Sequence, residues 1–403
     1  MLSIKGQKWR NWTGNVEGTP HYTMYPESIQ DLVEVVGLAR KKGRKIRVVG
    51  SGHSFTPLVQ TEEVLVSLDE LKGIVNIDSQ SIAGAISTGT HGTGITFGSL
   101  STQVIEITAV LSNGESIVCS ETENVEYWRA FQLSLGMLGI IVKIKLKVIP
   151  AYSLVYESEK QSLSTVMNKL EEYKKHRHFE FFVFPYSDEV QVKLTNETTN
   201  TGSDLKWHKL KVELLENRMF SLLSKGCKWF PSISKGVSRL SAKAVPNTKI
   251  IGPSYEVFAT SRTVPFYEME YSIPSKYMRT VVEEISNLIE KKKYKVHFPI
   301  ECRYVKGDDI WLSPAYGRDS AYIAVHMYKG MKYAAYFGEV EKIFLKYEGR
   351  PHWGKMHTLS YEQLQDIYPE FHSFLQARES LDELGMFFNP YAEKLFIPLF
   401  AGQ

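Results

Sequence analysis

A single histidine follows a glycine-rich turn in the run Gly50-Ser51-Gly52-His53-Ser54. The turn comes directly after a β-type run from Ile46 to Val49, and glycine accepts the positive φ that lets backbone N–H groups approach an anion. His53 would then stand beside whatever phosphate the turn holds. A Gly-x-Gly turn alone is a weak signal, and a loop histidine that only bonds its neighbours is the commoner case.

A second segment has the same character, because Ser81 to Gly94 contains four glycines, many small hydroxyl residues and His91. Such a segment offers backbone amides and short O–H donors, and we expect it to be a loop. Two loops of this kind predict a site for a long dinucleotide with a pyrophosphate at its middle. A glycine-rich turn without a ligand is the alternative.

Charged residues in the second half of the chain could act on a substrate. Glu301 and Arg303 are two apart on an expected strand, so they share a face and suit a polyhydroxylated molecule. A cross-strand ion pair on a wet sheet face is an equally ordinary reading. His352 and His357 are five apart and have no neighbouring cysteine or carboxylate cluster, so we expect no metal site.

Six motifs together resemble the flavin enzymes of the vanillyl-alcohol-oxidase type, and within them the sugar-1,4-lactone oxidases and alditol oxidases. The resemblance covers nearly the whole chain. The motifs are Gly50-Ser51-Gly52-His53-Ser54, Ser87-Thr88-Gly89-Thr90-His91-Gly92-Thr93-Gly94, Ser134-Leu135-Gly136-Met137-Leu138-Gly139-Ile140-Ile141, Glu301-Cys302-Arg303-Tyr304, His352-Trp353-Gly354-Lys355-Met356-His357 and Phe387-Phe388-Asn389-Pro390-Tyr391.

The resemblance implies FAD bonded covalently through His53 and a sugar lactone or polyol oxidised above it. O2 or another electron acceptor would reoxidise the flavin. Lys355 would face the flavin and the reacting carbon, and Glu301 and Arg303 would hold the substrate. The resemblance assigns FAD binding to Gly50, Ser51, Gly52, His53, Ser54, Ser81, Gly84, Ser87, Gly89, His91, Gly92, Thr93, Gly94, Gly139 and Ile141.

The periodicity of apolar residues predicts an α+β fold in both halves of the chain. Helices are expected over 28–42, 162–173, 276–292, 333–347 and 361–368, and strands over 46–49, 64–68, 104–111, 140–149, 179–185, 189–194, 268–274, 295–305 and 321–327. We expect an FAD-binding domain of the vanillyl-alcohol-oxidase/p-cresol-methylhydroxylase type over 1–150. An α+β substrate domain would span 151–403, with a tail near 380–403 returning to the flavin site.

One segment of the family's flavin domain is absent near Ile77-Asp78-Ser79. Family members pass through about one more strand–helix unit, of roughly 30 residues, before the second flavin loop. The domain is therefore shortened near 77–80, and its stable folding and FAD binding are at risk. A catalytically inactive flavoprotein remnant is one alternative to the oxidoreductase.

Composition narrows the class of protein. The net charge is only +3, which does not indicate a nucleic-acid partner. Three widely spaced cysteines indicate a reducing compartment such as the cytoplasm. No apolar run approaches the roughly 18 residues of a membrane span. The segment 207–249 is basic and amphipathic, so it is either a peripheral contact for an anionic membrane or a helix with a solvated cationic face.

A nicotinamide dehydrogenase is a further alternative. It requires Gly-x-Gly-x-x-Gly at the start of a helix. Here the third glycine is missing after Gly52, and Pro57 follows in the loop. A flavin-dependent oxidoreductase that acts on a sugar-1,4-lactone therefore remains the main prediction, with an alditol oxidase as its nearest variant.

Overall fold

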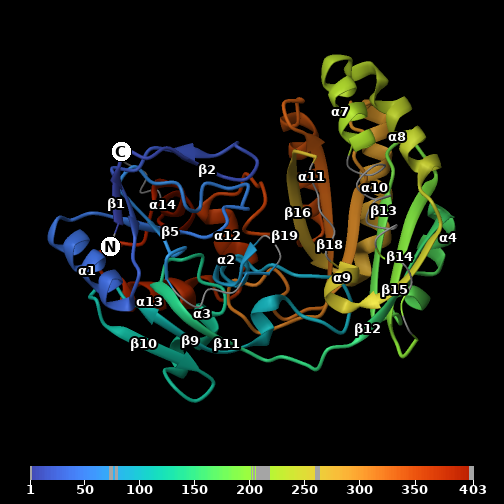
Figure 1. Ribbon diagram of the computed structural model, residues 1–403. Helices are drawn as coiled ribbons and strands as arrows, with labels where there is room; N and C mark the ends of the chain where they lie inside the picture. The colour runs from blue at the N-terminus through green and yellow to red at the C-terminus, as the bar shows by residue number, and fades with distance from the viewer. Residues whose placement is uncertain are drawn as a thin grey trace.

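The computed structural model describes residues 2–71, 76–77, 80–200, 202, 205, 218–258 and 264–398. Small sheets from the first part of the chain lie beside one large sheet from the second part (Figure 1). Helices and strands mix in both parts, so the α+β prediction is confirmed.

The first sheet holds the loop that carries His53. Its strands are β1 (Leu2–Lys5), β4 (Tyr22–Tyr25), β6 (Val64–Ser67) and β5 (Ile46–Val49), in that order. Helix α1 (Ile29–Lys41) begins at Ser28, whose Oγ accepts a hydrogen bond from the N–H of Asp31 at 3.1 Å. A small hairpin, β2 (Trp9–Arg10) and β3 (Glu17–Gly18), lies apart from this sheet.

The rest of this part brings the second glycine-rich segment into place. Strands β7 (Asn76–Ile77) and β8 (Gln80–Ser81) pair directly, and α2 (Ile82–Ser87) and η1 (Leu100–Gln103) follow. The expectation of a continuous loop over 81–94 is wrong, because its apolar residues Ala85 and Ile86 are buried on helix α2. A three-stranded sheet contains β10 (Ser116–Ser120), β9 (Val104–Val110) and β11 (Ile140–Leu146), with α3 (Val125–Phe131) after β10.

The large sheet is antiparallel and has eight strands. Their order is β15 (Thr248–Pro253), β12 (Ser153–Ser162), β14 (Glu189–Thr198), β13 (His178–Val183), β17 (Ile300–Val305), β18 (Ser320–Tyr328), β16 (Phe266–Pro274) and β19 (Arg350–Pro351). Strand β12 was not predicted. Strand β17 is shorter than expected, since it starts only at Ile300, and the helix expected over 162–173 is divided at Lys169 into α4 (Leu163–Asn168) and α5 (Leu170–Tyr173).

The two faces of the large sheet differ because side chains alternate along each strand. One face carries Tyr271, Ile323, Cys302 and Phe181 in a cross-strand row, all buried. Helix α11 (Ala334–Lys346) packs on this face, where the rings of Phe344 and Tyr271 stack at 4.9 Å. Helix α10 (Met278–Lys292) packs beside α11. The opposite face carries the charged residues.

Short helices cap the ends of this architecture. Helix α8 (Ser234–Ala244) contacts β14, and α9 (Ser254–Phe258) contacts β12 and β15. Helix α7 (Phe220–Trp229) and η3 (Pro231–Ile233) pack against α8, and η4 (Ser275–Tyr277) leads into α10. Helices α12 (Tyr361–Ile367), α13 (Phe371–Leu381) and α14 (Pro390–Phe396) return to the first part of the chain (Figure 1). There the N–H of Ile46 donates to the carbonyl of Met386 at 2.8 Å, and Asn389 Nδ2 donates to the carbonyls of Pro57 and Gln60, each at 2.8 Å.

Candidate active site

One cavity of about 980 Å³ lies between the first part of the chain and the charged face of the large sheet. Its volume is at the upper end of the range for small-molecule and cofactor sites. Most of the residues assigned to FAD line it: Gly50, Ser51, Gly52, His53, Ser54, Ser81, Gly84, Ser87, His91, Gly139 and Ile141. Arg303 and Lys355 also line it, together with Glu270 and His352, which the sequence did not suggest as site residues.

The His53 loop and the Lys355 loop are bonded to each other. The N–H of Phe55 donates to the carbonyl of Gly354 at 2.8 Å, and Thr56 Oγ1 donates to the carbonyl of Trp353 at 3.0 Å. The ring of His53 stacks on that of Trp12, with centroids 5.7 Å apart. These contacts bring two motifs that are about 300 residues apart to the same end of the cavity.

The two glycine-rich segments also touch. A Cβ on Gly50 would stand 2.0 Å from Ser81 Oγ, and one on Gly84 would stand 2.9 Å from the same atom, so a larger residue at either position would force the Ser81 side chain to move. Gly52 has φ +65, which favours glycine. The segments therefore form a narrow cradle of backbone amides and hydroxyls along the cavity, and this donor set fits the pyrophosphate of FAD.

Some of the predicted residues do not line the cavity. Gly89 and Gly92 are outside its wall, and Thr93 and Gly94 bond to the large sheet, where the Gly94 N–H donates to the carbonyl of Tyr304 at 2.8 Å. Glu301 is buried behind Arg303, and its Oε1 accepts from Arg303 Nε at 3.0 Å. The assignment of these residues to the flavin or the substrate stays a prediction.

Arg47 holds the cavity wall and was missed from the sequence. It is buried on β5 and donates to the carbonyl oxygens of Leu135, at 2.8 Å, of Gly136 and of Phe387. Burial lowers its pKa to about 10. Leu135 and Gly136 both have positive φ and line the cavity, so Arg47 fixes a strained turn of the site. An arginine in an apolar strand was the available signal.

The charged face of the large sheet forms one end of the cavity. Glu268 and Glu270 are two apart on β16 and share a face, as do Glu301 and Arg303 on β17. The small residue Ala324 of β18 lies between Glu270 and Glu301, and His326 lies opposite Glu268. Glu301 and Arg303 share a face as expected and form an ion pair. Glu301 is buried, so the alternative of a wet sheet face is wrong.

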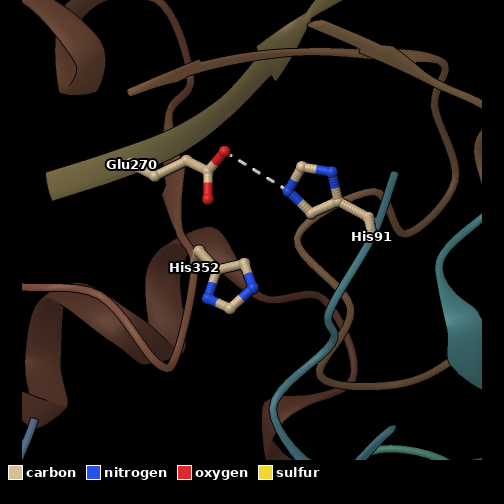
Figure 2. A group of neighbouring side chains, drawn as sticks. All are labelled: His91, Glu270 and His352. Atoms are coloured by element: carbon tan, nitrogen blue, oxygen red, sulfur yellow. Dashed lines mark ion pairs between the residues drawn. The ribbon is translucent and has the colours of Figure 1, made fainter. Parts of the chain in front are cut away.

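Among the carboxylates of the charged face, Glu270 lines the cavity, whereas Glu268 and Glu301 do not. His91 Nε2 lies 3.4 Å from its Oε1, and His352 is the third member of this group (Figure 2). Burial by itself raises the pKa of Glu270, but His91, Arg303 and Lys355 outweigh burial and hold that pKa well below its ordinary range. The Glu270 carboxylate is therefore ionised, in a site surrounded by cationic groups.

Lys355 is paired with a second carboxylate. Its Nζ lies 2.5 Å from Glu268 Oε2, and the backbone N–H of Met356 donates to the carbonyl of Glu268 at 3.0 Å. Burial raises the pKa of Glu268, whereas Lys355 and His326 lower it, and the net result is a pKa of about 2. For Arg303, burial opposes the charge, but Glu301, Glu270 and Glu180 raise its pKa.

The hydrogen bonds of His352 bear on whether this group binds a metal. His91, Glu270 and His352 each place a ligand atom within 4.8 Å of the others, as do Glu268, Glu301 and His326. His352 Nδ1 accepts from the N–H of Gly354 at 3.0 Å, and burial lowers its pKa to about 3. A neutral His352 must therefore carry its proton on Nε2, which makes that atom a donor. Lys355 and Arg303 already pair with Glu268 and Glu301, so this wall suits charge stabilisation better than metal binding.

The fold is shared with flavin oxidases of known structure. Cholesterol oxidase from B. sterolicum matches with a TM-score of 0.80 over 98% of this chain and 97% of that one, at 14% sequence identity. A family model described as an FAD binding domain matches residues 20–81. Residues 20–81 thus belong to an FAD binding domain, and FAD is the cofactor.

A second family model, described as D-arabinono-1,4-lactone oxidase, matches residues 144–395. The L-gulono-1,4-lactone dehydrogenase of Mycobacterium tuberculosis is 33% identical over 97% of this chain and 99% of its own length. The L-gulonolactone oxidase of Scyliorhinus torazame is 29% identical over 97% and 98%. The chain belongs to the D-arabinono-1,4-lactone oxidase family of FAD-dependent oxidoreductases.

The alignment with the mycobacterial relative also bears on the shortened domain. It spans 427 positions, whereas 97% of the 403 residues is about 391, so about 36 positions have no residue in this chain. The FAD-binding match ends at residue 81, where the junction lies. Asp78 and Ser79 are outside the described residues. The segments on either side, Asn76–Ile77 and Gln80–Ser81, pair as antiparallel strands of two residues each, and α2 follows directly.

Proposed function

We propose that this protein oxidises a CH–OH group of a sugar-1,4-lactone, with the lactone lying between the flavin and the charged face of the large sheet. The cavity supports this proposal. Both phosphate-compatible glycine-rich segments line it, and so do Glu270, Arg303, His352 and Lys355. A carboxylate and two cations within one wall provide acceptors and donors for several hydroxyl groups and for a lactone carbonyl.

FAD, when bound, accepts the hydride that leaves the hydroxyl-bearing carbon of the substrate. The Glu270 carboxylate is the group in the wall that can take the hydroxyl proton, because it is ionised and the cavity reaches it. Its pKa is low, so it is a weak base. A weak base suffices here, since the hydroxyl becomes strongly acidic as its carbon loses hydride.

Lys355 and Arg303 supply positive charge at the same place. Lys355 is held by Glu268, and Arg303 by Glu301, so both cations are fixed before substrate arrives. Preorganised charge of this kind stabilises negative charge that develops during a reaction without the cost of reorienting solvent. Glu301 thereby acts through Arg303, as a residue that positions it.

His53 is proposed to hold FAD covalently. It lines the cavity, its ring is steadied by Trp12, and its loop is bonded to the loop of Lys355. Wild-type protein precipitated with acid should stay yellow, and His53→Ala should release the colour into the supernatant. Release of colour from wild-type protein would refute the covalent bond while leaving non-covalent binding intact.

Flavin reduction under anaerobic conditions tests the substrate class. L-Gulono-1,4-lactone or D-arabinono-1,4-lactone should bleach the flavin band of purified protein, and a straight-chain alditol should do so far more slowly. Faster bleaching by the alditol would make the protein an alditol oxidase. If no compound bleaches a fully loaded flavin, the protein is an inactive remnant and the proposal fails.

The electron acceptor is proposed to be O2 or another acceptor, such as a membrane electron carrier. The relatives are named both as oxidases and as a dehydrogenase. Oxygen consumption measured beside dye reduction, with the same lactone and the same enzyme preparation, would separate the two acceptors.

A further inference from the structure

The helical hairpin α7–α8 carries an exposed aromatic tip that the oxidation of a lactone does not use. The tip consists of Trp229, Phe230 and Ile233, whose exposures are 78%, 67% and 43%. It lies where α7 ends and η3 begins, and Figure 1 shows α7 projecting from the large-sheet part of the molecule. Exposed adjacent aromatic residues are costly in water and mark a contact surface.

Helix α7 has two different apolar faces. Ser224 and Cys227 are buried, and Phe220 and Leu223 pack against the core beside them. Leu222, which is 67% exposed, and Trp229 lie about half a turn away, on the opposite side of the helix. The outward side thus carries two large apolar residues whose exposure is not explained by packing of the hairpin onto its own sheet.

The charge around the tip has one sign. Residues 218–249 contain no aspartate or glutamate and seven basic residues: Arg218, Lys225, Lys228, Lys235, Arg239, Lys243 and Lys249. Lys225, Lys228 and Lys235 are exposed and flank the tip in the sequence. Lysine beside exposed tryptophan and phenylalanine is the composition that binds the interface of anionic lipid bilayers.

We propose that the tip is a peripheral membrane contact, in which Trp229 and Phe230 enter the headgroup region while the flanking lysines bind anionic lipid. This assigns a role to the described part of the basic segment 207–249. Residues 207–217 lie outside the described residues. No helix in the described part of the chain is long and apolar enough to cross a bilayer.

Co-sedimentation of the full-length protein with vesicles tests the proposal. The protein should bind vesicles of phosphatidylcholine with phosphatidylserine, should bind pure phosphatidylcholine far less, and should be released by salt. The double variant Trp229→Ser/Phe230→Ser should bind the vesicles at least about tenfold more weakly, because it removes both rings that would enter the headgroup region. Lys225→Gln/Lys228→Gln should also bind less, with a weaker response to salt.

Matched controls keep the result interpretable. Leu38→Ser/Leu384→Ser removes two exposed apolar side chains from the other part of the molecule, and Lys291→Gln/Lys292→Gln removes two exposed charges from the end of α10. Both should bind like wild type, and all variants should keep wild-type flavin content. Wild-type protein that ignores anionic vesicles, or a tip variant that binds them normally, overturns the proposal. A dimer that the tip variant abolishes would assign the tip to a second copy instead.

Discussion

The Lys355–Glu268 pair links the stability of the site to its charge, and a double-mutant cycle can measure that link. The Glu268 pKa falls from an ordinary 4.5 to about 2, which corresponds to about 3 kcal/mol of stabilisation of the ionised form. Lys355 is the largest contribution in that direction. Lys355→Met leaves a buried carboxylate without its cation, and Glu268→Gln leaves a cation without its carboxylate, so each should be strongly destabilising.

The double variant should be destabilised by much less than the sum of the losses in the two single variants. Replacing both charges removes the unpaired group that each single variant leaves, and we expect a coupling free energy of about 2 to 3 kcal/mol. For a domain of this size each kcal/mol moves the melting temperature by about 2–4 °C. Scanning calorimetry of all four proteins at pH 7 supplies the measurement. Lys346→Met, which removes an exposed cation paired with Glu284, should change the melting temperature very little.

The same pair predicts a pH dependence. A carboxylate with a lowered pKa stabilises the fold above its ordinary pKa and loses that contribution as pH falls through the native value. The stability difference between wild type and Glu268→Gln should therefore be at its maximum above pH 4.5 and should shrink as the pH falls towards about 2. Strictly additive melting shifts, or a difference that does not change below pH 4.5, would refute the electrostatic reasoning.

Three further predictions concern the flavin and the cavity. Glu270→Gln should slow flavin reduction, measured by stopped-flow absorbance, by about 100-fold or more with little change in lactone affinity. The activity of the wild-type enzyme should fall on the acid side only below pH 4.5. Arg47→Met leaves three backbone carbonyls without their donor, each at a cost of about 1–3 kcal/mol. It should therefore lower both the melting temperature and the amount of flavin retained on gel filtration. Normal flavin content would contradict a positioning role for Arg47. Re-insertion of a family-like strand–helix segment after Asp78 should raise flavin content and melting temperature, and full loading of the unmodified chain would show that the shortening is tolerated.

Much of the fold was predictable, because its elements have strong periodicity or clear caps. Helix α1 begins at its predicted cap Ser28, and the hairpin turn before β10 follows from Asn113-Gly114, where Gly114 has φ +86. Strand β12 was missed because polar residues such as Glu157 and Glu159 interrupt its apolar pattern. Its place in the sheet is set by pairing with β14 over ten residues, which is a long-range property.

The candidate site, like the fold, could be predicted from the sequence only in part. Motifs identified the loops of His53 and Lys355 and the pair Glu301–Arg303. Glu268 and Glu270 were read only as polar positions of a strand, since the sequence does not show that they face Lys355 and His91 across a buried sheet. That juxtaposition depends on the register of β16 with β18 and on the short strand β19, which brings His352 beside Glu270.

The shortened flavin domain can be weighed against what remains. The sequence predicts that a segment is missing between the two flavin loops, and about 36 positions of the alignment with the mycobacterial relative have no residue in this chain. The loops nevertheless approach each other closely at Gly50 and Ser81. Part of the support comes from the far end of the chain, because Met386 and Phe387 belong to the same core cluster as Leu32, Val36 and Ile46. The charged wall is formed by the large sheet and by residues 352–355, so it does not depend on the absent segment. Loss of that segment should therefore weaken retention of FAD more than it alters the groups that act on the substrate. We expect the loaded enzyme to reduce its flavin at an ordinary rate but to release FAD readily.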